Sequence, residues 1–254
     1  MDFSGYSYEK KLVAFVDILG FRNKTKLTTS DAKKPVHSML AQIREYIKDI
    51  KRNNTQDIQG GKYYVFSDSS LYSADKVDFN KLVSVIMKLQ FLAATEGFFF
   101  RGGLTYGEIY DENEFFYGKG LNRAYEMESK VAIYPRIVID KKNELTRSKA
   151  NKIYLKQDFD GLYFIDFLKK LPEDDGCSNE NNVYSDENYR KIREHIQKEI
   201  EANKTNLYVL MKFGWVAKYF NNFIEEENID CEKVNFSDFM IGKYKNSPTV
   251  DGGE

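Results

Sequence analysis

The chain has 254 residues, 42% hydrophobic and 15% aromatic, enough for one substantial core. Its 38 basic and 39 acidic residues leave a net charge of −1, which argues against generic binding to nucleic acid or to an anionic membrane. The two cysteines, Cys177 and Cys231, are far apart and have no nearby histidine, which argues against a disulfide scaffold or a zinc site. Neither a signal peptide nor a membrane-spanning run is evident, so we expect a cytoplasmic protein.

The first half of the chain alternates between strand and helix patterns. An apolar run over residues 11–17, ending in Asp17, predicts a central strand buried on both faces. Further strand signals are a hairpin over 62–74, a strand pair over 97–118 and a strand over 134–140. Apolar residues at helical spacing predict helices over 32–52, 79–95 and 118–130. This order predicts an α+β, ferredoxin-like βαββαβ fold with an extra hairpin strand, in which one antiparallel sheet carries helices on one face.

The last third of the chain predicts a helical extension. A polar stretch over 171–186 indicates a flexible loop, and two helices are expected over 187–203 and 205–226. We therefore expect a domain over 1–170, an extension over 187–241 and a frayed tail over 242–254.

Two aspartates stand at the ends of predicted strands. Asp17 ends the first strand, and Asp68 lies at the tip of the 62–74 hairpin. In such a sheet the first strand commonly lies beside the second or third, so the two carboxylates can be neighbours that repel each other. Divalent ions relieve that repulsion, and hard oxygen ligands suit Mg²⁺ or Mn²⁺. The alternative, a strand end and an Asx-turn without any ligand, stays open at this level.

The turn after Asp17 has the features of a phosphate-binding loop. Leu19, Gly20 and Phe21 open a strand-to-helix connection whose backbone N–H groups can hold phosphate oxygens. Arg22 follows at once and offers a planar fork of donors to the same oxygens.

Three motifs occur in a fixed order: FVDILGF, YVFSDSS, and RGGLTYGEIY followed by FFYGKGLNRAYEME. They resemble the two metal-binding motifs and the third conserved block of the class III nucleotidyl cyclases. Across residues 11–140 the pattern is most similar to the pyrimidine cyclases of bacterial Pycsar anti-phage systems. The resemblance implies metal binding by Asp17, Asp68 and the carbonyl of Ile18, phosphate binding by Gly20, Phe21 and Arg22, and ribose orientation by Asn122.

The chain departs from the wider family in its positive charges. Arg22 stands where many cyclases have threonine, which implies that the triphosphate is held differently. Glu126 stands where adenylate-type cyclases place an arginine, and an acid cannot stabilise developing negative charge. Arg123 or Arg136 are the candidates to replace that arginine, with Arg123 taken as the catalytic one.

The base-reading positions depart as well. Tyr64 and Phe115 replace the lysine and the acid that read adenine in adenylate cyclases. A tyrosine hydroxyl suits a smaller base, and the pyrimidine cyclases resemble this chain at that position. Packing of both aromatic residues on strands is the alternative.

The resemblance implies a cyclase that converts UTP or CTP into cyclic UMP or cyclic CMP plus pyrophosphate, with uridylate favoured. Two Mn²⁺ or Mg²⁺ ions would assist attack of the ribose 3′-OH on the α-phosphate. The family implies a head-to-tail homodimer with composite sites, and a separate cyclic-nucleotide-gated effector that reads the product in anti-phage defence.

Two other readings remain open. One is a degenerate cyclase-like domain that only binds nucleotide, which Glu126 favours. The other is an RNA-binding βαββαβ domain that stacks bases on sheet aromatics such as Tyr63 or Phe99, although the net charge is against it.

Overall fold

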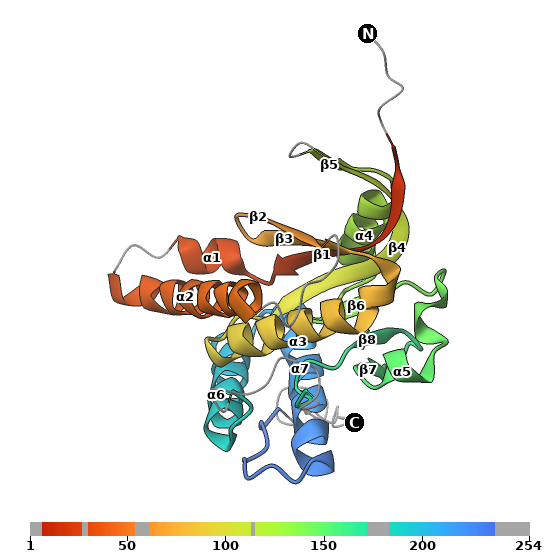
Figure 1. Ribbon diagram of the computed structural model, residues 1–254. Coiled ribbons are helices and arrows are strands. Elements are labelled where there is room, and N and C mark those ends of the chain that lie inside the picture. Colours follow the sequence, from red (N-terminus) through yellow and green to blue (C-terminus); the bar gives the residue numbers. More distant parts are fainter. Residues whose placement is uncertain (1–6, 27–29, 54–60, 113–114, 172–182, 237–254) are drawn as a thin grey trace, which may run out of the picture.

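The computed structural model describes residues 7–26, 30–53, 61–112, 115–171 and 183–236 (Figure 1). The strands are β1 (Glu9–Ile18), β2 (Lys62–Phe66), β3 (Ser69–Ala74), β4 (Phe100–Glu112), β5 (Phe115–Tyr117), β6 (Ile137–Ile139), β7 (Leu155–Gln157) and β8 (Tyr163–Ile165). The helices are α1 (Phe21–Thr25), α2 (Ser30–Asn53), α3 (Phe79–Thr95), α4 (Lys119–Lys130), α5 (Lys149–Lys152), α6 (Asp186–Ala202) and α7 (Leu207–Glu226). Two 3₁₀ turns, η1 (Lys76–Asp78) and η2 (Glu144–Thr146), complete the described elements.

The sheet confirms the predicted ferredoxin-like core. Its strand order is β2-β3-β1-β4-β6-β8-β7, with β5 paired to β4 as the extra hairpin strand. β1 lies antiparallel between β3 and β4, which is the arrangement of a split βαβ unit. The expectation of a purely antiparallel sheet is wrong, because β6 runs parallel to β4.

One face of the sheet is covered by a continuous apolar core. Leu12, Ala14 and Val16 of β1 alternate along the strand and are at most 1% exposed. They join a cluster that includes Met39 of α2 and Leu82 of α3. α3 is buried along most of its length, which is why its boundaries follow the predicted apolar periodicity so closely.

The opposite face is only partly covered, by α4. Figure 1 shows α4 on the other side of the sheet from α2 and α3, so the expectation of helices on one face is wrong. Gly103 of β4 allows the close approach, since a Cβ there would lie 2.4 Å from the Cβ of Met127. β1 is therefore not buried on both faces as predicted, because Phe15 and Asp17 point to this side and are half-buried.

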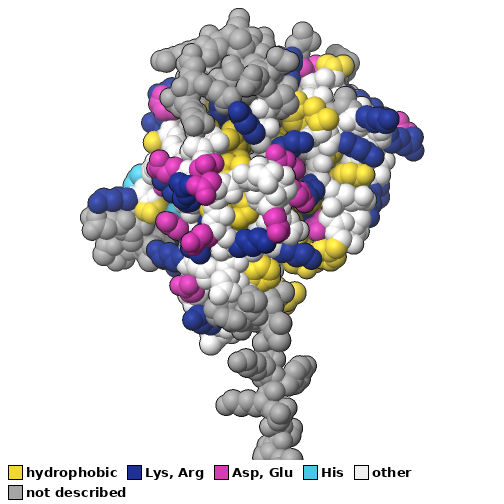
Figure 2. Space-filling model, turned by 90° about the horizontal axis from the view of Figure 1, so that it is seen from below, with side chains coloured by type: hydrophobic (Ala, Val, Ile, Leu, Met, Phe, Trp, Pro, Cys, Tyr) yellow, Lys and Arg dark blue, Asp and Glu magenta, His cyan; other side chains and the backbone are white. Residues whose placement is uncertain are grey.

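The C-terminal helices pack on the sheet layer. α6 and α7 form a second core cluster with Phe91 of α3, Phe99 before β4 and Phe164 of β8. Seen from this side, Figure 2 shows positive and negative side chains interspersed over the surface. None of the helices in the described ranges has the length and hydrophobicity to cross a membrane.

The remaining differences from the predicted elements are small. The short α1, α5 and β7 were not predicted, because segments of three to five residues carry too little periodicity. Most of the predicted loop over 171–186 and all of the tail over 242–254 lie outside the described residues. The division into a domain and an extension stays a prediction.

Candidate active site

The first strand and the β2–β3 turn bring Asp17 and Asp68 together, as the sequence predicts. Asp17 pairs with Ser69 in the β1–β3 register, directly after Asp68. The N–H of Ile18 donates to the carbonyl of Asp68 over 2.9 Å, which fixes the turn against the end of β1. Ser67 holds a positive φ of 56°, a conformation that costs a non-glycine residue energy and that concentrates at functional sites.

Asp17 also has a partner that the sequence reading did not assign. The Nε of Arg101, its neighbour on β4, donates to Oδ2 of Asp17 over 3.2 Å. The same guanidinium forms an ion pair with Glu128 of α4, with 2.6 Å between Nη2 and Oε1. Ser69 donates a long hydrogen bond of 3.4 Å to the other oxygen of Asp17. Arg101 thus joins β1, β4 and α4 beside the two aspartates.

The positive charge of Arg101 does not fully compensate the burial and mutual repulsion of the carboxylates around it. Burial raises the pKa of Asp17, Arg101 offsets only part of that effect, and the nearby charge of Asp68 raises the pKa further. The pKa of Glu128 is raised for the same reason, by burial and then by its acidic neighbours, against the pull of Arg101. Carboxylates with raised pKa values in a half-buried place are typical of sites that take up a cation or a proton.

α7 adds a lysine to this cluster. Lys212 is half-buried, and burial together with Arg101 lowers the pKa of its ammonium group, while Asp17 and Glu128 act to raise it. Its neighbour Phe213 packs edge-on against Phe99, two residues before Arg101, with ring centroids 5.5 Å apart. Within the described residues Lys212 forms no ion pair or hydrogen bond, so its charge is available to an anion.

The donor set suits a hard divalent cation. Two carboxylates that repel each other, with the carbonyl of Ile18 between them in sequence, are oxygen ligands of the kind Mg²⁺ and Mn²⁺ prefer. In the described part of the chain there is no cluster of three or more His, Cys, Asp or Glu side chains arranged to hold a metal. A metal here would need further oxygens, and substrate phosphates supply them in many magnesium sites.

The turn at Gly20 that was predicted to bind phosphate is formed, but one of its backbone N–H groups is used inside the fold. Gly20 adopts φ 71°, and a Cβ there would meet nothing within 4 Å, so the backbone conformation alone favours glycine. The N–H of Leu19 is used inside the fold, because it donates to the carbonyl of Phe99 over 2.8 Å. Phe21 packs into the core, whereas Arg22 is exposed beside the turn.

The residues predicted on α4 lie apart from the aspartates of the same chain. α4 runs along β4 with Gly120 against Gly107 and Met127 against Gly103, which places exposed Asn122 beside the middle of β4. About 13 Å of strand separate that point from Arg101, the partner of Asp17.

Arg123, on the same helix, is fully engaged. Its Nε and Nη2 each donate to Asp140 over 2.9 Å, and its Nη1 donates to Glu126 over 3.2 Å. Burial alone would raise the pKa of Asp140, but these bonds help to bring it below the ordinary value. Arg136, the other candidate cation, is buried in ion pairs with Asp158 and Asp160 on the β7–β8 connection.

Tyr64 takes part in a polar cluster above β2 and β3. Its hydroxyl donates to Oδ1 of Asp111 over 2.8 Å. Lys62 reaches the same oxygen over 2.9 Å, and Ser73 donates to Oδ2 over 3.0 Å. Phe115 is not the aromatic neighbour of Tyr64: its side chain is 67% exposed, and Phe116 lies against the tyrosine ring with centroids 5.6 Å apart.

The sequence analysis did not single out four residues that the structure places beside the predicted ones: Arg101, Glu128 and Lys212 around Asp17, and Asp111 at Tyr64. Arg101 had a signal, since it opens the RGG motif and a register with β1 would have put it opposite Asp17. Glu128 and Lys212 reach the site only through helix packing, for which one sequence carries no direct signal.

No family model and no curated protein matches the chain. A structure of a bacterial light-regulated adenylyl cyclase matches with 15% identity and a TM-score of 0.41, over 67% of this chain and 97% of that one. The catalytic core of a rhodopsin-guanylyl cyclase with converted specificity, in complex with ATPαS, matches with 18% identity and a TM-score of 0.42, over 62% and 95%. Another bacterial light-regulated adenylyl cyclase structure has 13% identity and a TM-score of 0.43, over 68% and 56%. Likeness at this level assigns no activity to this chain.

Proposed function

We propose that this protein is a nucleotidyl cyclase that converts a pyrimidine nucleoside triphosphate, UTP or CTP, into the 3′,5′-cyclic monophosphate and pyrophosphate. One observation carries the proposal. Asp17 and Asp68 lie together where β1 meets the β2–β3 turn, beside the Gly20 turn and the half-buried cations Arg101 and Lys212. Paired carboxylates next to cations suit a triphosphate with its divalent ions, and the sequence resemblance to class III cyclases supports the same chemistry.

The residues divide into two roles. Asp17, Asp68 and the carbonyl of Ile18 would hold Mg²⁺ or Mn²⁺. When bound, such ions lower the pKa of the ribose 3′-OH and neutralise charge on the phosphates. Arg101 and Lys212 are the cations placed to bind the phosphate oxygens.

In this proposal Arg123 has a structural role and not the catalytic role predicted from the sequence. Its donors are committed to Asp140 and Glu126, so it anchors α4 to the strand that follows it. The transition-state charge therefore falls to the cations beside Asp17.

Asp111 sets the hydrogen-bonding direction of Tyr64. The Tyr64 hydroxyl donates its hydrogen to Asp111, so toward a base it acts only as an acceptor, through its oxygen. That oxygen accepts from N3–H of uracil or from the 4-amino group of cytosine. The Asp111→Asn variant removes this constraint, and we expect about a tenfold loss of kcat/KM for the preferred pyrimidine. Tyr64→Phe is the matched variant, and an unchanged kcat/KM for both UTP and CTP in the two variants would contradict the assignment.

The partly covered face of the sheet supports a homodimer. Phe66 of β2 and Tyr125 of α4 are 59% and 55% exposed on this face. Since Asn122 is displaced from Asp17 within one chain, a second copy placed head to tail would supply it and complete the site. Asp17→Ala and Asn122→Ala should each be inactive, and their mixture should regain activity. A mixture that stays inactive while both variants fold and dimerise rules out composite sites.

The direct test is incubation of the protein with Mn²⁺ and each of the four nucleoside triphosphates, followed by chromatography for cyclic product and pyrophosphate. We expect cyclic UMP or cyclic CMP, with uridylate favoured, and little purine product. Purine products in excess would overturn the pyrimidine assignment, and absence of any cyclic product would overturn the activity. A product of this kind would act as a signal in anti-phage defence, read by a separate cyclic-nucleotide-gated effector.

A degenerate, nucleotide-binding domain is the second candidate. Glu126 favours this candidate, because an acid stands where adenylate-type cyclases place an arginine. Glu126 also accepts a hydrogen bond from Arg123, so Arg123 does not offer an unpaired positive charge at that position. In that case the triphosphate binds with Mn²⁺ but no cyclic product forms.

A further inference from the structure

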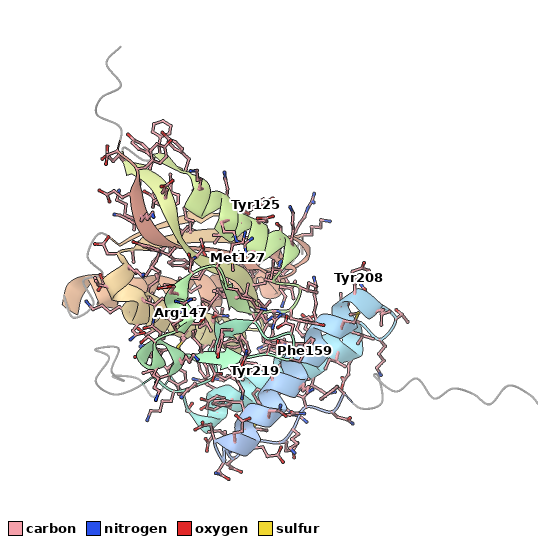
Figure 3. The ribbon with its side chains drawn as sticks, turned by 90° about the vertical axis from the view of Figure 1, so that its right-hand side faces the viewer. Tyr125, Met127, Arg147, Phe159, Tyr208 and Tyr219 are labelled. Atoms are coloured by element: carbon pink, nitrogen blue, oxygen red, sulfur yellow. The ribbon has the colours of Figure 1, made fainter. Side chains whose placement is uncertain are left out.

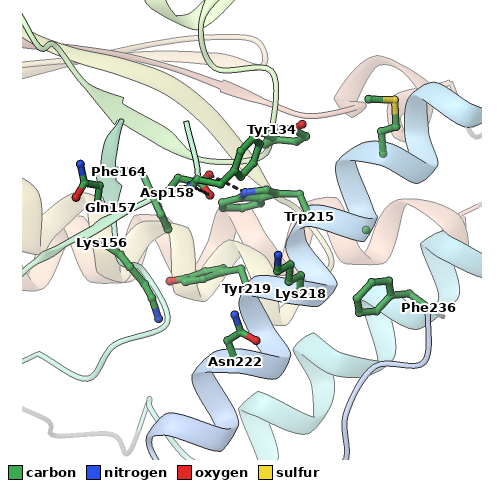
Figure 4. A pocket seen from close by; sticks show the side chains of 13 residues that line it. Tyr134, Lys156, Gln157, Asp158, Phe164, Trp215, Lys218, Tyr219, Asn222 and Phe236 are labelled. Carbon is green, nitrogen blue, oxygen red and sulfur yellow. Dashed lines mark hydrogen bonds between the residues drawn. The ribbon is translucent and has the colours of Figure 1, made fainter. Parts of the chain in front are cut away.

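A cavity of about 430 Å³ lies between α7 and the β7–β8 strand pair (Figure 4). Neither Asp17 nor Asp68 lines it, so it is separate from the carboxylate site. Its volume lies within the range of small-molecule sites. The apolar lining includes Tyr134, Phe164, Trp215, Tyr219 and Phe236.

The aromatic wall of this cavity is held in place by the fold. Trp215 stacks with Tyr134 at 14° and with Tyr219 at 24°, with ring centroids 5.8 Å and 5.4 Å apart. The indole N–H of Trp215 donates to Asp158 over 2.7 Å. At the rim, Phe159 is 73% exposed and lies edge-on to Tyr134. Figure 3 shows Phe159 beside α7, which carries Tyr219, and both lie apart from Tyr125 on α4.

The charge that remains at the cavity is positive. Asp158 is matched by Arg136, by the indole of Trp215 and by a backbone N–H. Lys156 pairs with Glu226, with 2.6 Å between Nζ and Oε2. Lys218, one turn from Trp215 on α7, is exposed and forms no ion pair or hydrogen bond with the residues that the structure describes.

We propose that this cavity binds a planar aromatic ring that carries an anionic group, of the size of a nucleoside monophosphate or smaller. The ring packs among Trp215, Tyr219 and Phe236, and the anion binds the ammonium group of Lys218. The amide of Asn222, one turn further along α7, supplies donors and an acceptor to the polar edge of the ring. A cation is disfavoured, because the one carboxylate in the lining is already matched.

Trp215 makes the proposal directly measurable, because it is the only tryptophan in the chain. Its fluorescence is titrated in EDTA with AMP and UMP, which carry ring and phosphate, with adenosine, which lacks the phosphate, and with ribose 5-phosphate, which lacks the ring. We expect saturable quenching by at least one of the monophosphates, about tenfold weaker binding of the matching nucleoside, and no saturable change with ribose 5-phosphate. Absence of saturable quenching by both monophosphates overturns the proposal.

Matched variants separate this cavity from the carboxylate site. Lys218→Ala should weaken monophosphate binding about tenfold, whereas Lys170→Ala, which removes an exposed charge outside the cavity, should leave it unchanged. Phe236→Ala should weaken binding as well; because Phe236 also packs against the C-terminal core, its binding is compared at a temperature where the variant is folded. Asp17→Asn should bind as the wild type does, so failure of the proposed cyclase leaves this test intact. Equal binding by the wild type and Lys218→Ala, or loss of binding in Asp17→Asn, contradicts the assignment.

Discussion

Arg101 and Arg136 each hold two carboxylates, but the two clusters are matched to different degrees. Arg136 is 1% exposed and binds Asp158 and Asp160, and the indole of Trp215 donates to the first of these. Burial alone would raise the pKa of Asp160, yet its hydrogen bonds with Arg136 and a backbone N–H bring it below the ordinary value. Both carboxylates of this cluster have their partners without a ligand, although the buried Nε of Arg136 has no hydrogen-bond partner among the described residues.

The cluster around Arg101 is not complete. Asp17 and Glu128 keep pKa values above their ordinary ones although Arg101 contacts both, and Lys212 stands nearby without an ion pair among the described residues. Two arginine–carboxylate clusters of similar composition therefore differ in their capacity to bind a charged ligand. The matched one holds strands and α7 together, and the unmatched one is left able to bind charged ligands.

Removing one charge at the incomplete cluster should give the largest effect on activity. With Asp17→Asn we expect cyclase turnover to fall about a thousandfold or more, which corresponds to about 4 kcal/mol, because an amide is a poor ligand for a divalent ion. The measurement is formation of cyclic pyrimidine nucleotide in Mn²⁺, with circular dichroism as the check of folding.

The matched change in the other cluster is Asp160→Asn. It should retain turnover at any temperature where the variant is folded, because Asp160 lies in the ion pairs of Arg136 and not beside Asp17. A folded Asp17→Asn that keeps near wild-type turnover would remove Asp17 from the chemistry.

Removal of the arginine should lower stability more in the Arg136 cluster than in the Arg101 cluster. Arg136→Leu leaves the half-buried carboxylate of Asp158 and the exposed one of Asp160 without their counter-ion, and we expect a loss of about 3 kcal/mol in the free energy of unfolding. Urea denaturation measures it. Arg101→Leu should cost less stability, since its side chain is 26% exposed, but it should abolish turnover. If the two variants lose equal stability, the distinction between the clusters fails.

How far the sequence predicts these features depends on the range of the contacts. The helix over 79–95 was predicted at its observed bounds, because its apolar periodicity is local and its buried face is wide. The meeting of Asp17 with Asp68 followed from strand order alone. By contrast, the packing of α4 on the far face depends on glycines such as Gly103, whose role appears only when a helix is placed over them.

The partners of Arg123 and Arg136 likewise could not be predicted from the sequence. Arg123 and Arg136 were candidates for one catalytic role, yet each is held by a carboxylate 17 or more residues away in sequence, Asp140 for Arg123 and Asp158 for Arg136. A single sequence does not encode which of many acids a cation meets. The same holds for Lys212, which reaches the site through the packing of Phe213 on Phe99.

Lys212 should have a smaller effect than the carboxylates. Lys212→Met keeps the aliphatic stem of the side chain but removes the charge, so we expect KM for the nucleoside triphosphate to rise about tenfold with a smaller change in kcat. Lys170→Met, which removes an exposed charge away from both sites, is the matched control and should leave KM unchanged. Steady-state kinetics at fixed Mn²⁺ give both values, and equal KM values for the wild type and Lys212→Met would exclude a phosphate contact.

The smallest expected effect is on the melting temperature at pH 7. Neutralising one aspartate should raise it in the Arg101 cluster and lower it in the Arg136 cluster. Because folding raises the pKa of Asp17, the stability that this group contributes is present at low pH and is lost as pH rises through the folded-state pKa. At pH 7 without metal, Asp17→Asn should therefore melt above the wild type, and the difference should shrink toward pH 4.

Asp160 should behave in the reverse way. Folding lowers its pKa, so its contribution is present above the unfolded-state pKa and is lost as pH falls through the lower folded-state value. Asp160→Asn should thus melt below the wild type at pH 7, again with a smaller gap in acid. Each shift should be at most a few degrees, since about 1 kcal/mol corresponds to about 2–4 °C in a chain of this size. Calorimetric melting curves of both variants in EDTA from pH 4 to 8 check the signs. Shifts of the same sign would mean that Asp17 is as well matched by Arg101 as Asp160 is by Arg136.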